Sequence, residues 1–215
     1  MNRALAPAAL AALLLASWPV SAQYDGWTEY HPNKTIFTMG YQMAQPLGSL
    51  HDYISSASFR GFTFDWQSIL TKEFGAGLRF AWNRFNQSDS AVTQTTVGGG
   101  TITAPLFRYA DQFAIEAVGH YYIDTGPRSI FQPFLGVGIG GVWANAYQQS
   151  VDLGLSQNGF YFIVSPEIGL NIVLARGSTT AALNLAVLYN FTTASYRNVS
   201  NAQMIAETIG FSFSY

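Results

Sequence analysis

The sequence predicts an all-β chain that folds as an eight-stranded antiparallel up-and-down transmembrane β-barrel. Charged residues make up 10% of its 215 residues, against about 25% in a typical soluble domain, so a soluble fold would lack a charged outer face. After residue 22, no apolar run reaches the ~18 residues of a membrane-spanning helix. Only helices and closed barrels satisfy every backbone polar group in lipid, so the closed barrel remains.

The beginning of the chain predicts export. Arg3 is followed by an apolar run over residues 4–20, and Val20-Ser21-Ala22 forms a small-residue cleavage site. We therefore expect residues 1–22 to be a signal peptide and residues 23–215 to form one barrel domain, with a short periplasmic segment before the first strand. The chain has no Cys, which excludes disulfides and thiolate metal sites.

The predicted strands are segments in which large apolar residues alternate with small or polar ones. A period of two places these two kinds of residue on opposite faces of a strand. The segments are Thr35–Met43, Phe59–Ile69, Gly75–Phe85, Leu106–Ile123, Phe131–Tyr147, Phe160–Leu174, Thr179–Phe191 and Ala206–Tyr215.

The last predicted strand has the clearest two-faced pattern. Its large residues alternate with Thr208, Gly210, Ser212 and Ser214. An unpaired aromatic strand at a chain end invites aggregation, so we expect it to pair with the first strand and to face lipid. The residues expected to face lipid are Ile209, Phe211, Phe213 and Tyr215.

The connections between these strands alternate in length, which predicts their sidedness. Transmembrane barrels of bacteria have short turns at the periplasmic rim and longer loops outside. Both chain ends then lie on the periplasmic side. The predicted short turns are Leu70–Phe74, Asp124–Ser129 and Ala175–Ser178, and the predicted loops are Gln45–Ser56, Asn86–Pro105 (the longest unpatterned segment), Gln148–Asn158 and Thr192–Asn201.

The charged residues within the strands decide which face points inward. Asp65, Arg79, Glu116 and Glu167 all lie on the small-residue face, together with His120. An Arg facing lipid at mid-depth costs about 2–4 kcal/mol, so this face should line the lumen. Across the hairpin, Asp65 and Arg79 fall at similar depth. We expect a luminal polar network with Arg79 as its centre and Glu116 and Glu167 as further partners, which leaves no wide pore.

The terminal strand, the segment Pro133–Gly141 and the tripeptide Arg60-Gly61-Phe62 give the chain a family resemblance. From Thr35 to Tyr215 it resembles the small eight-stranded outer-membrane β-barrel proteins, the OmpA- and OmpX-like group. The resemblance implies a monomer in a bacterial outer membrane, surrounded by lipid and lipopolysaccharide. It also implies that the barrel-assembly machinery reads the terminal strand as a C-terminal signal. It implies a structural or surface-interaction role and no enzymatic reaction.

Other motifs have simpler interpretations. Gly136, Gly138 and Gly141 match a dinucleotide-binding pattern, but such a site needs a helix directly afterwards, and the strand pattern continues instead. Inward glycines that make room in a narrow barrel explain them. His31 and His51 lie on separate segments from His120, without metal-ligand spacing. The sequence therefore predicts no metal or cofactor, and a net charge of -2 gives no sign of nucleic-acid binding.

Two alternative functions stay open. Some small outer-membrane barrels modify lipid A, and His51 with Asp89-Ser90 could approach the arrangement of a palmitoyltransferase-like acyltransferase. A deacylase His-x-Ser motif is missing, because His120 is followed by Tyr121-Tyr122. The other alternative is a narrow channel for small solutes.

Overall fold

The computed structural model of the chain describes residues 34–95, 100–126, 129–150, 153–176, 179–196 and 199–215. The predicted signal peptide, residues 1–22, and the predicted periplasmic segment after it lie outside this range.

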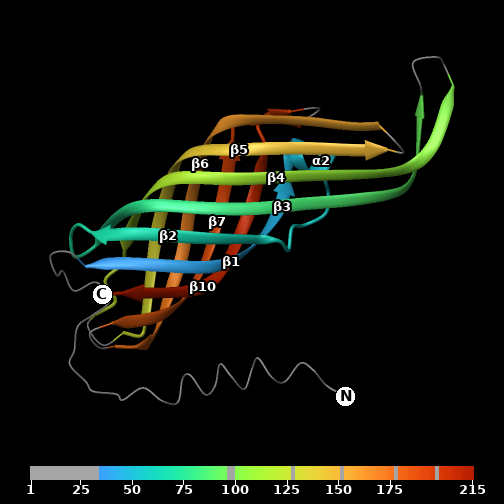
Figure 1. The fold of residues 1–215 in the computed structure, drawn as a ribbon. Helices are drawn as coiled ribbons and strands as arrows, with labels where there is room; N and C mark the ends of the chain where they lie inside the picture. The colour runs from blue at the N-terminus through green and yellow to red at the C-terminus, as the bar shows by residue number, and fades with distance from the viewer. Residues whose placement is uncertain (1–33, 96–99, 127–128, 151–152, 177–178, 197–198) are drawn as a thin grey trace, which may run out of the picture.

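Eight antiparallel strands of the described chain close into a single barrel, which confirms the predicted fold class (Figure 1). The barrel order is β1-β10-β7-β6-β5-β4-β3-β2, so sequential neighbours pair and the last strand meets the first. The strands are β1 (Thr35–Leu47), β2 (Gly61–Ile69), β3 (Phe74–Thr95), β4 (Thr101–Tyr122), β5 (Phe131–Ser150), β6 (Leu153–Ala175), β7 (Thr180–Thr192) and β10 (Gln203–Ser214).

The terminal strand closes the barrel, as the sequence predicted. β10 pairs with β1 along its whole length, from Leu47 with Gln203 to Ile36 with Ser214. Thr35 and Tyr215 then exchange two backbone hydrogen bonds of 3.0 and 3.1 Å. This pairing leaves no open sheet edge in the wall, which is the condition for a sheet to cross lipid.

The two faces of the wall follow the predicted alternation. On β10, Phe211 is 51% exposed and its neighbour Ser212 is 1% exposed. The large residues of the other strands likewise point outward, among them Met39, Trp66, Ile139, Phe162 and Val187. Buried residues on the inner face include many polar ones. The wall therefore has an apolar outer surface and a polar lumen, which is the arrangement that lipid requires.

Two predicted loops are wrong, because they are mostly strand. Within Asn86–Pro105, β3 continues to Thr95 and β4 begins at Thr101. Within Gln148–Asn158, β5 continues to Ser150 and β6 begins at Leu153. These strand ends carry Ser, Thr, Gln and Asn without apolar alternation. A sheet outside the membrane has no lipid-facing side, so its sequence lacks the period-two signal.

The two loops beside the chain's first and last strands contain small elements of structure. β1 extends three residues into the predicted loop Gln45–Ser56, to Leu47, and a short helix, α2 (Gly48–Tyr53), follows it directly. The predicted loop Thr192–Asn201 contains a small hairpin of β8 (Ser195–Tyr196) and β9 (Val199–Ser200). In the part of the chain that the structure describes, no helix is long and apolar enough to cross a membrane.

The orientation of the barrel gives a prediction about accessibility. The C-terminus lies at one end of the barrel, and the long β3–β4 hairpin projects from the other (Figure 1). A peptide tag inserted between β3 and β4, within 96–99, should be labelled on intact cells. A tag within Ala175–Ser178 should be labelled only after permeabilisation. The reverse pattern would invert the orientation.

Candidate functional site

Arg79 occupies the middle of the lumen and binds Asp65 through both ends of its guanidinium fork. The side chain is 1% exposed. Its Nε and Nη2 atoms donate to the two carboxylate oxygens of Asp65, each at 2.9 Å. The two residues are direct partners in the β2–β3 ladder, so they lie at the same depth. A bidentate pair of this kind fixes geometry as well as charge.

Glu167 extends the network across the lumen. It comes from β6, which is not adjacent to β3 in the wall, yet its Oε2 accepts a hydrogen bond from Arg79 Nη2. The same oxygen lies 3.0 Å from His120 Nε2 on β4. Asp65, Arg79, His120 and Glu167 thus join four strands through one cluster, and their side chains fill the lumen at this level.

Arg79 makes its hydrogen bonds and ion pairs with Asp65 and Glu167 and none with Glu116, although the sequence suggested Glu116 as a further partner. Arg79 and Glu116 are register partners in the β3–β4 ladder, but the donors Nε and Nη2 of Arg79 bind Asp65 and Glu167 instead. The Oε2 atom of Glu116 is buried without a hydrogen-bond partner. It points over Gly138 of β5, where a Cβ atom would overlap it.

The inward glycines of β5 make room for this network. A Cβ at Gly136 would overlap the His120 ring, and one at Gly138 would overlap the Glu116 carboxylate. β5 continues through Gly141 without a helix. Gly136 and Gly138 therefore serve the packing of a narrow lumen. The inward expectation is wrong for Gly141, where a Cβ would overlap the ring of Phe160 on the outer face. The dinucleotide interpretation has no support in this geometry.

Next to the network, toward the end of the barrel where the C-terminus lies, are a hydrogen-bonded pair and a ring contact that the sequence analysis missed. The hydroxyl of Tyr122 donates to Gln67 Oε1 at 3.0 Å, and both side chains are buried. Phe134 stands edge-on to His120, with ring centroids 5.0 Å apart. Parity along β4 places Tyr122 on the same inward face as His120, so the period-two pattern carried the signal.

At the outer end, α2 and the residue after it cover the lumen. Leu50 and Ile54 are fully buried there and belong to one apolar cluster with Phe85 and Met204. Arg108 on β4 donates to the backbone oxygen of Tyr53 at 2.5 Å. The lumen is thus filled by charged groups in the middle and by apolar groups above, so the barrel has no wide pore.

The residues considered for lipid A chemistry are engaged elsewhere. The Asp89 carboxylate accepts hydrogen bonds from Gln87 and from Arg108. His51 lies on α2 and is exposed, and His31 precedes the described residues. Among the residues described, no group of three or more His, Cys, Asp or Glu could hold a metal ion.

No known family description matches the sequence, and no curated protein matches it. Solved structures do match. Ail of Yersinia pestis, solved in complex with the heparin analogue sucrose octasulfate, is 10% identical with a TM-score of 0.52, over 86% of this chain and 100% of Ail. Neisserial surface protein A is 14% identical with a TM-score of 0.53, over 85% of this chain and 97% of that protein. These likenesses identify the fold as that of the small outer-membrane β-barrels.

Proposed function

We propose that this protein is a monomeric outer-membrane barrel whose role is surface interaction, carried by a sheet that projects beyond the barrel rim. The projecting sheet supports this proposal more than any other feature. In β3, residues 85–95 run past the start of β2, and in β6, residues 153–161 run past the end of β7. Together with the ends of β4 and β5, these residues form a four-stranded extension paired only within itself.

The extension is braced by two ion pairs. Arg84 donates two hydrogen bonds to Asp111, at 2.6 and 2.8 Å, and Arg108 pairs with Asp89. The bracing supports a role as a stiff platform rather than a loose loop. Its two outer strands also present backbone groups to solvent on their free sides, and such edges accept additional strands or hydrogen-bonding ligands.

The chemistry of the extension favours an uncharged ligand. The cations Arg84 and Arg108 are already held by carboxylates, and the remaining surface is rich in Ser, Thr, Gln and Asn. Ail was solved with a sulfated heparin analogue, and such a ligand needs free cations. We therefore propose that this extension binds by hydrogen bonds to backbone or hydroxyl groups, and not to sulfated polymers.

The outer wall supports residence in the outer membrane, surrounded by lipid and lipopolysaccharide. Trp82, Phe113, Trp143 and Phe160 are successive register partners on β3 to β6, and they form an aromatic row at the base of the extension. Aromatic girdles of this kind mark the membrane interface of outer-membrane barrels. Export through removal of residues 1–22 is part of the same proposal.

A trimmed protein tests the proposed function. Replacing residues 90–105 with Asn-Gly joins Asp89 to its register partner Leu106 through a two-residue hairpin turn. We expect this variant to keep the heat-dependent gel shift of a folded barrel. Cells that carry it should lose adhesion to immobilised glycans and matrix proteins, relative to cells with the intact protein.

Three results would contradict the proposal. Undiminished adhesion of cells with the trimmed protein would remove the role of the extension. Single-channel conductance of the intact protein in planar bilayers would favour the narrow channel. A change in lipid A mass in cells that express the protein would favour the acyltransferase-like enzyme.

We also propose that Ile209, Phe211, Phe213 and Tyr215 act as the assembly signal, which predicts an effect of Tyr215 in cells. Tyr215 is exposed and stacks on Phe37 of β1, with centroids 5.7 Å apart. Deleting Tyr215 should reduce the yield of barrel in the outer membrane several-fold but leave refolding in detergent nearly unchanged. Tyr215→Phe keeps the ring and should assemble normally. An equal loss in both settings would indicate a structural role only.

A further inference from the structure

The outer face of the extension carries three aromatic rings close together. Tyr109 on β4 and Tyr147 on β5 are register partners, and their ring centroids lie 6.3 Å apart with the ring planes inclined by 35°. Phe107 comes two residues before Tyr109 on β4, so it shares the same face. Phe107 is 40% exposed, and the two tyrosines are half-buried. We call these three residues the aromatic patch.

The aromatic patch lies farther out than the level at which lipid ends. The pair Tyr109 and Tyr147 is four residues along the strands from Phe113 and Trp143 of the aromatic row, which corresponds to about 13 Å. Between these two levels, the ion pair of Arg84 and Asp111 lies on the same face. Charged side chains are tolerated near the membrane interface and not deeper in the hydrocarbon. Lipid therefore explains the aromatic row but not the aromatic patch, and apolar groups gathered on a surface in water mark a binding site.

The opposite face of the same strands is already occupied. Phe85 and Ala110 are buried in the apolar cluster that covers the lumen, and Arg108 donates to the backbone oxygen of Tyr53. Because residues alternate between the two faces of a strand, these contacts leave the face with the aromatic patch open.

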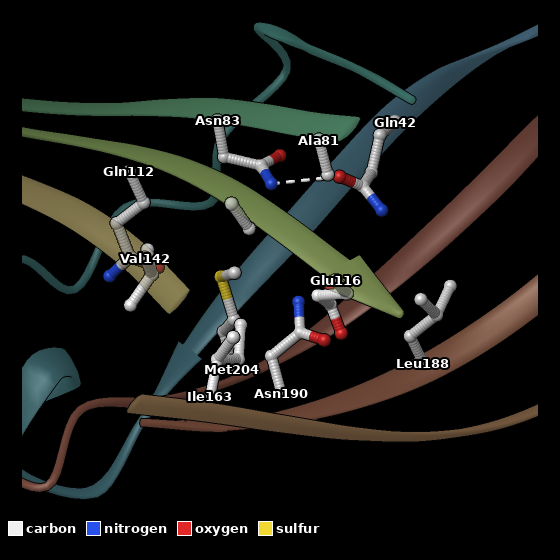
Figure 2. Close-up of a pocket in the computed structure, with 11 residues that line it drawn as sticks. Gln42, Ala81, Asn83, Gln112, Glu116, Val142, Ile163, Leu188, Asn190 and Met204 are labelled. Carbon is white, nitrogen blue, oxygen red and sulfur yellow. Dashed lines mark hydrogen bonds between the residues drawn. The ribbon is translucent and has the colours of Figure 1, made fainter. Parts of the chain in front are cut away.

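The luminal cavity in Figure 2 has room for no more than a water molecule. Polar and apolar side chains from different strands crowd around it. Its volume is about 10 Å³, which is about the space that one water molecule needs. A larger ligand would therefore bind to the outside of the protein.

Uncharged hydrogen-bonding side chains flank the aromatic patch on the same face. They come from β3, β5 and β6 and offer amide and hydroxyl groups that both donate and accept. In the part of the chain that the structure describes, neither tyrosine hydroxyl of the patch forms a hydrogen bond. The flanking residues, all exposed, are Asn86, Ser88, Gln149 and Ser156.

Gly154 on β6 lets the Tyr147 ring lean over the sheet. A Cβ atom built at Gly154 would come within 2.7 Å of the Tyr147 hydroxyl oxygen and 3.4 Å of two of its ring carbons. The outer edge of the ring thus covers the neighbouring strand at a position without a side chain. A ring that leans over in this way leaves its upper side open to solvent.

These features match the two sides of a neutral hexose. One face of such a sugar carries C–H groups that pack on aromatic rings, and its rim carries hydroxyl groups that donate and accept hydrogen bonds. An acidic or sulfated sugar would need a free cation, but Arg84 beside the patch is held by Asp111. A protein partner would need about 800 Å² of buried surface on each side, for which three rings bordered by amides and hydroxyls are a small apolar centre.

We propose that the aromatic patch binds a neutral hexose ring of a glycan on the surface to which the cell adheres. The C–H face of the sugar packs on the three rings, and its hydroxyl groups bond to the flanking side chains. This inference rests on the proposed function, because it names the ligand class of the same extension. In the trimmed protein Phe107 lies one residue from the new turn, which disturbs the patch, so point variants of the full chain are the sharper test.

Binding to a panel of immobilised neutral oligosaccharides tests the proposal. The panel presents glucose, galactose, mannose and N-acetylated hexoses, and the intact protein is applied in detergent without lipopolysaccharide. We expect binding to at least one member, unchanged by added salt because no ion pair forms. Removing one aromatic ring from a stacking site typically weakens binding about tenfold, and we expect this loss for Tyr109→Ala and for Tyr147→Ala.

Two further variants show that the loss belongs to the rings of the patch. Tyr109→Phe keeps the ring and should bind more tightly than Tyr109→Ala. Tyr121→Ala removes an exposed tyrosine at the other end of the barrel and should bind like the wild-type protein. Absence of binding to every member of the panel would overturn the proposal, as would undiminished binding by both Tyr109→Ala and Tyr147→Ala. Binding to the core oligosaccharide of lipopolysaccharide alone would also overturn it, because the patch would then hold the cell's own surface.

Cell adhesion separates this proposal from the proposed function. If Tyr109→Ala and Tyr147→Ala adhere like the wild-type protein while the trimmed protein does not, the role of the extension stands and the aromatic patch is not its binding site. If the trimmed protein adheres undiminished, the role of the extension fails, and the panel alone decides whether the patch binds sugar.

Saturation-transfer NMR provides a measurement that needs no variant. The wild-type protein is mixed with an oligosaccharide that it binds on the panel, and its aromatic protons are irradiated. The C–H protons on one face of a hexose should receive the saturation. Equal transfer to both faces would overturn the proposal. If the alanine variants fail to fold, which the gel shift reveals, the panel and this measurement on the wild-type protein still decide the question.

Discussion

Replacing Arg79 with Ala should lower the free energy of unfolding by about 3–5 kcal/mol, the usual cost of removing one partner from a buried ion pair. The cost is large because two buried carboxylates remain after the guanidinium is removed. Asp65 and Glu167 both lose their guanidinium partner in a part of the lumen where both are buried. Neither carboxylate can turn to water without opening the wall. Against a total stability of about 5–15 kcal/mol, this loss is a large fraction.

The measurement is urea unfolding of the detergent-refolded protein, followed by the gel shift between folded and boiled forms. Arg84→Ala is the matched control, because Arg84 also makes a bidentate pair, with Asp111, but on the outer face and half exposed. Exposed pairs contribute about 0–1 kcal/mol, so the control should change little. If Arg79→Ala were no more destabilising than Arg84→Ala, the network would not hold the barrel together.

The wall of the barrel could be predicted from the sequence, because lipid imposes the same rule on every strand. One face must be apolar, so residues such as Phe211 and Ser212 reveal their sides by parity alone. The same parity placed Arg79 and Glu167 in the lumen. Outside the membrane a strand needs no apolar face, and there the sequence predicted loops where the structure has strands. The residues of β3 beyond Asn86 are strand because they pair with β4, not because of their own pattern.

Contacts across the lumen could not be predicted in the same way. Asp65 and Arg79 lie on adjacent strands of one hairpin, so counting from the turn placed them together. Glu167 reaches Arg79 from a strand that is not its neighbour, and that contact depends on the tilt and stagger of the closed barrel. Register pairs Glu116 with Arg79, but the guanidinium binds Asp65 and Glu167, and the Glu116 carboxylate points over Gly138 instead.

The cap over the lumen was beyond the sequence for another reason. Residues 48–53 give only a short polar and apolar mixture, and α2 is held by contacts from distant parts of the chain. Ser49 donates to the backbone oxygen of Ser200 at 2.7 Å. The backbone oxygen of Tyr53 accepts a hydrogen bond from the guanidinium of Arg108. A helix of six residues is unstable alone in water. Its existence therefore depends on tertiary packing that no local pattern records.

A single methyl group at Gly140 should also destabilise the barrel strongly. Gly140 on β5 pairs with Glu116 and with Ile163 in the two flanking ladders. A Cβ built there overlaps the backbone oxygen of Ile115 and lies 2.7 Å from the Cα of Glu116. A side chain could rotate away from such a clash, but a backbone that is hydrogen-bonded on both sides cannot. We expect Gly140→Ala to cost more than the ~1–3 kcal/mol typical of added methylenes in a packed core.

Gly119→Ala on the neighbouring strand separates this effect from the loss of a glycine as such. Gly119 faces the lipid side, where a Cβ would approach only the Phe74 ring, at 3.3 Å, and a ring at the surface can shift. The two variants are compared by urea unfolding in detergent and by the yield of folded barrel in the outer membrane. Gly119→Ala should resemble the wild-type protein in both. Equal behaviour of the two variants would mean that β4 and β5 tolerate separation, and the close approach at Gly140 would then not be required for the wall.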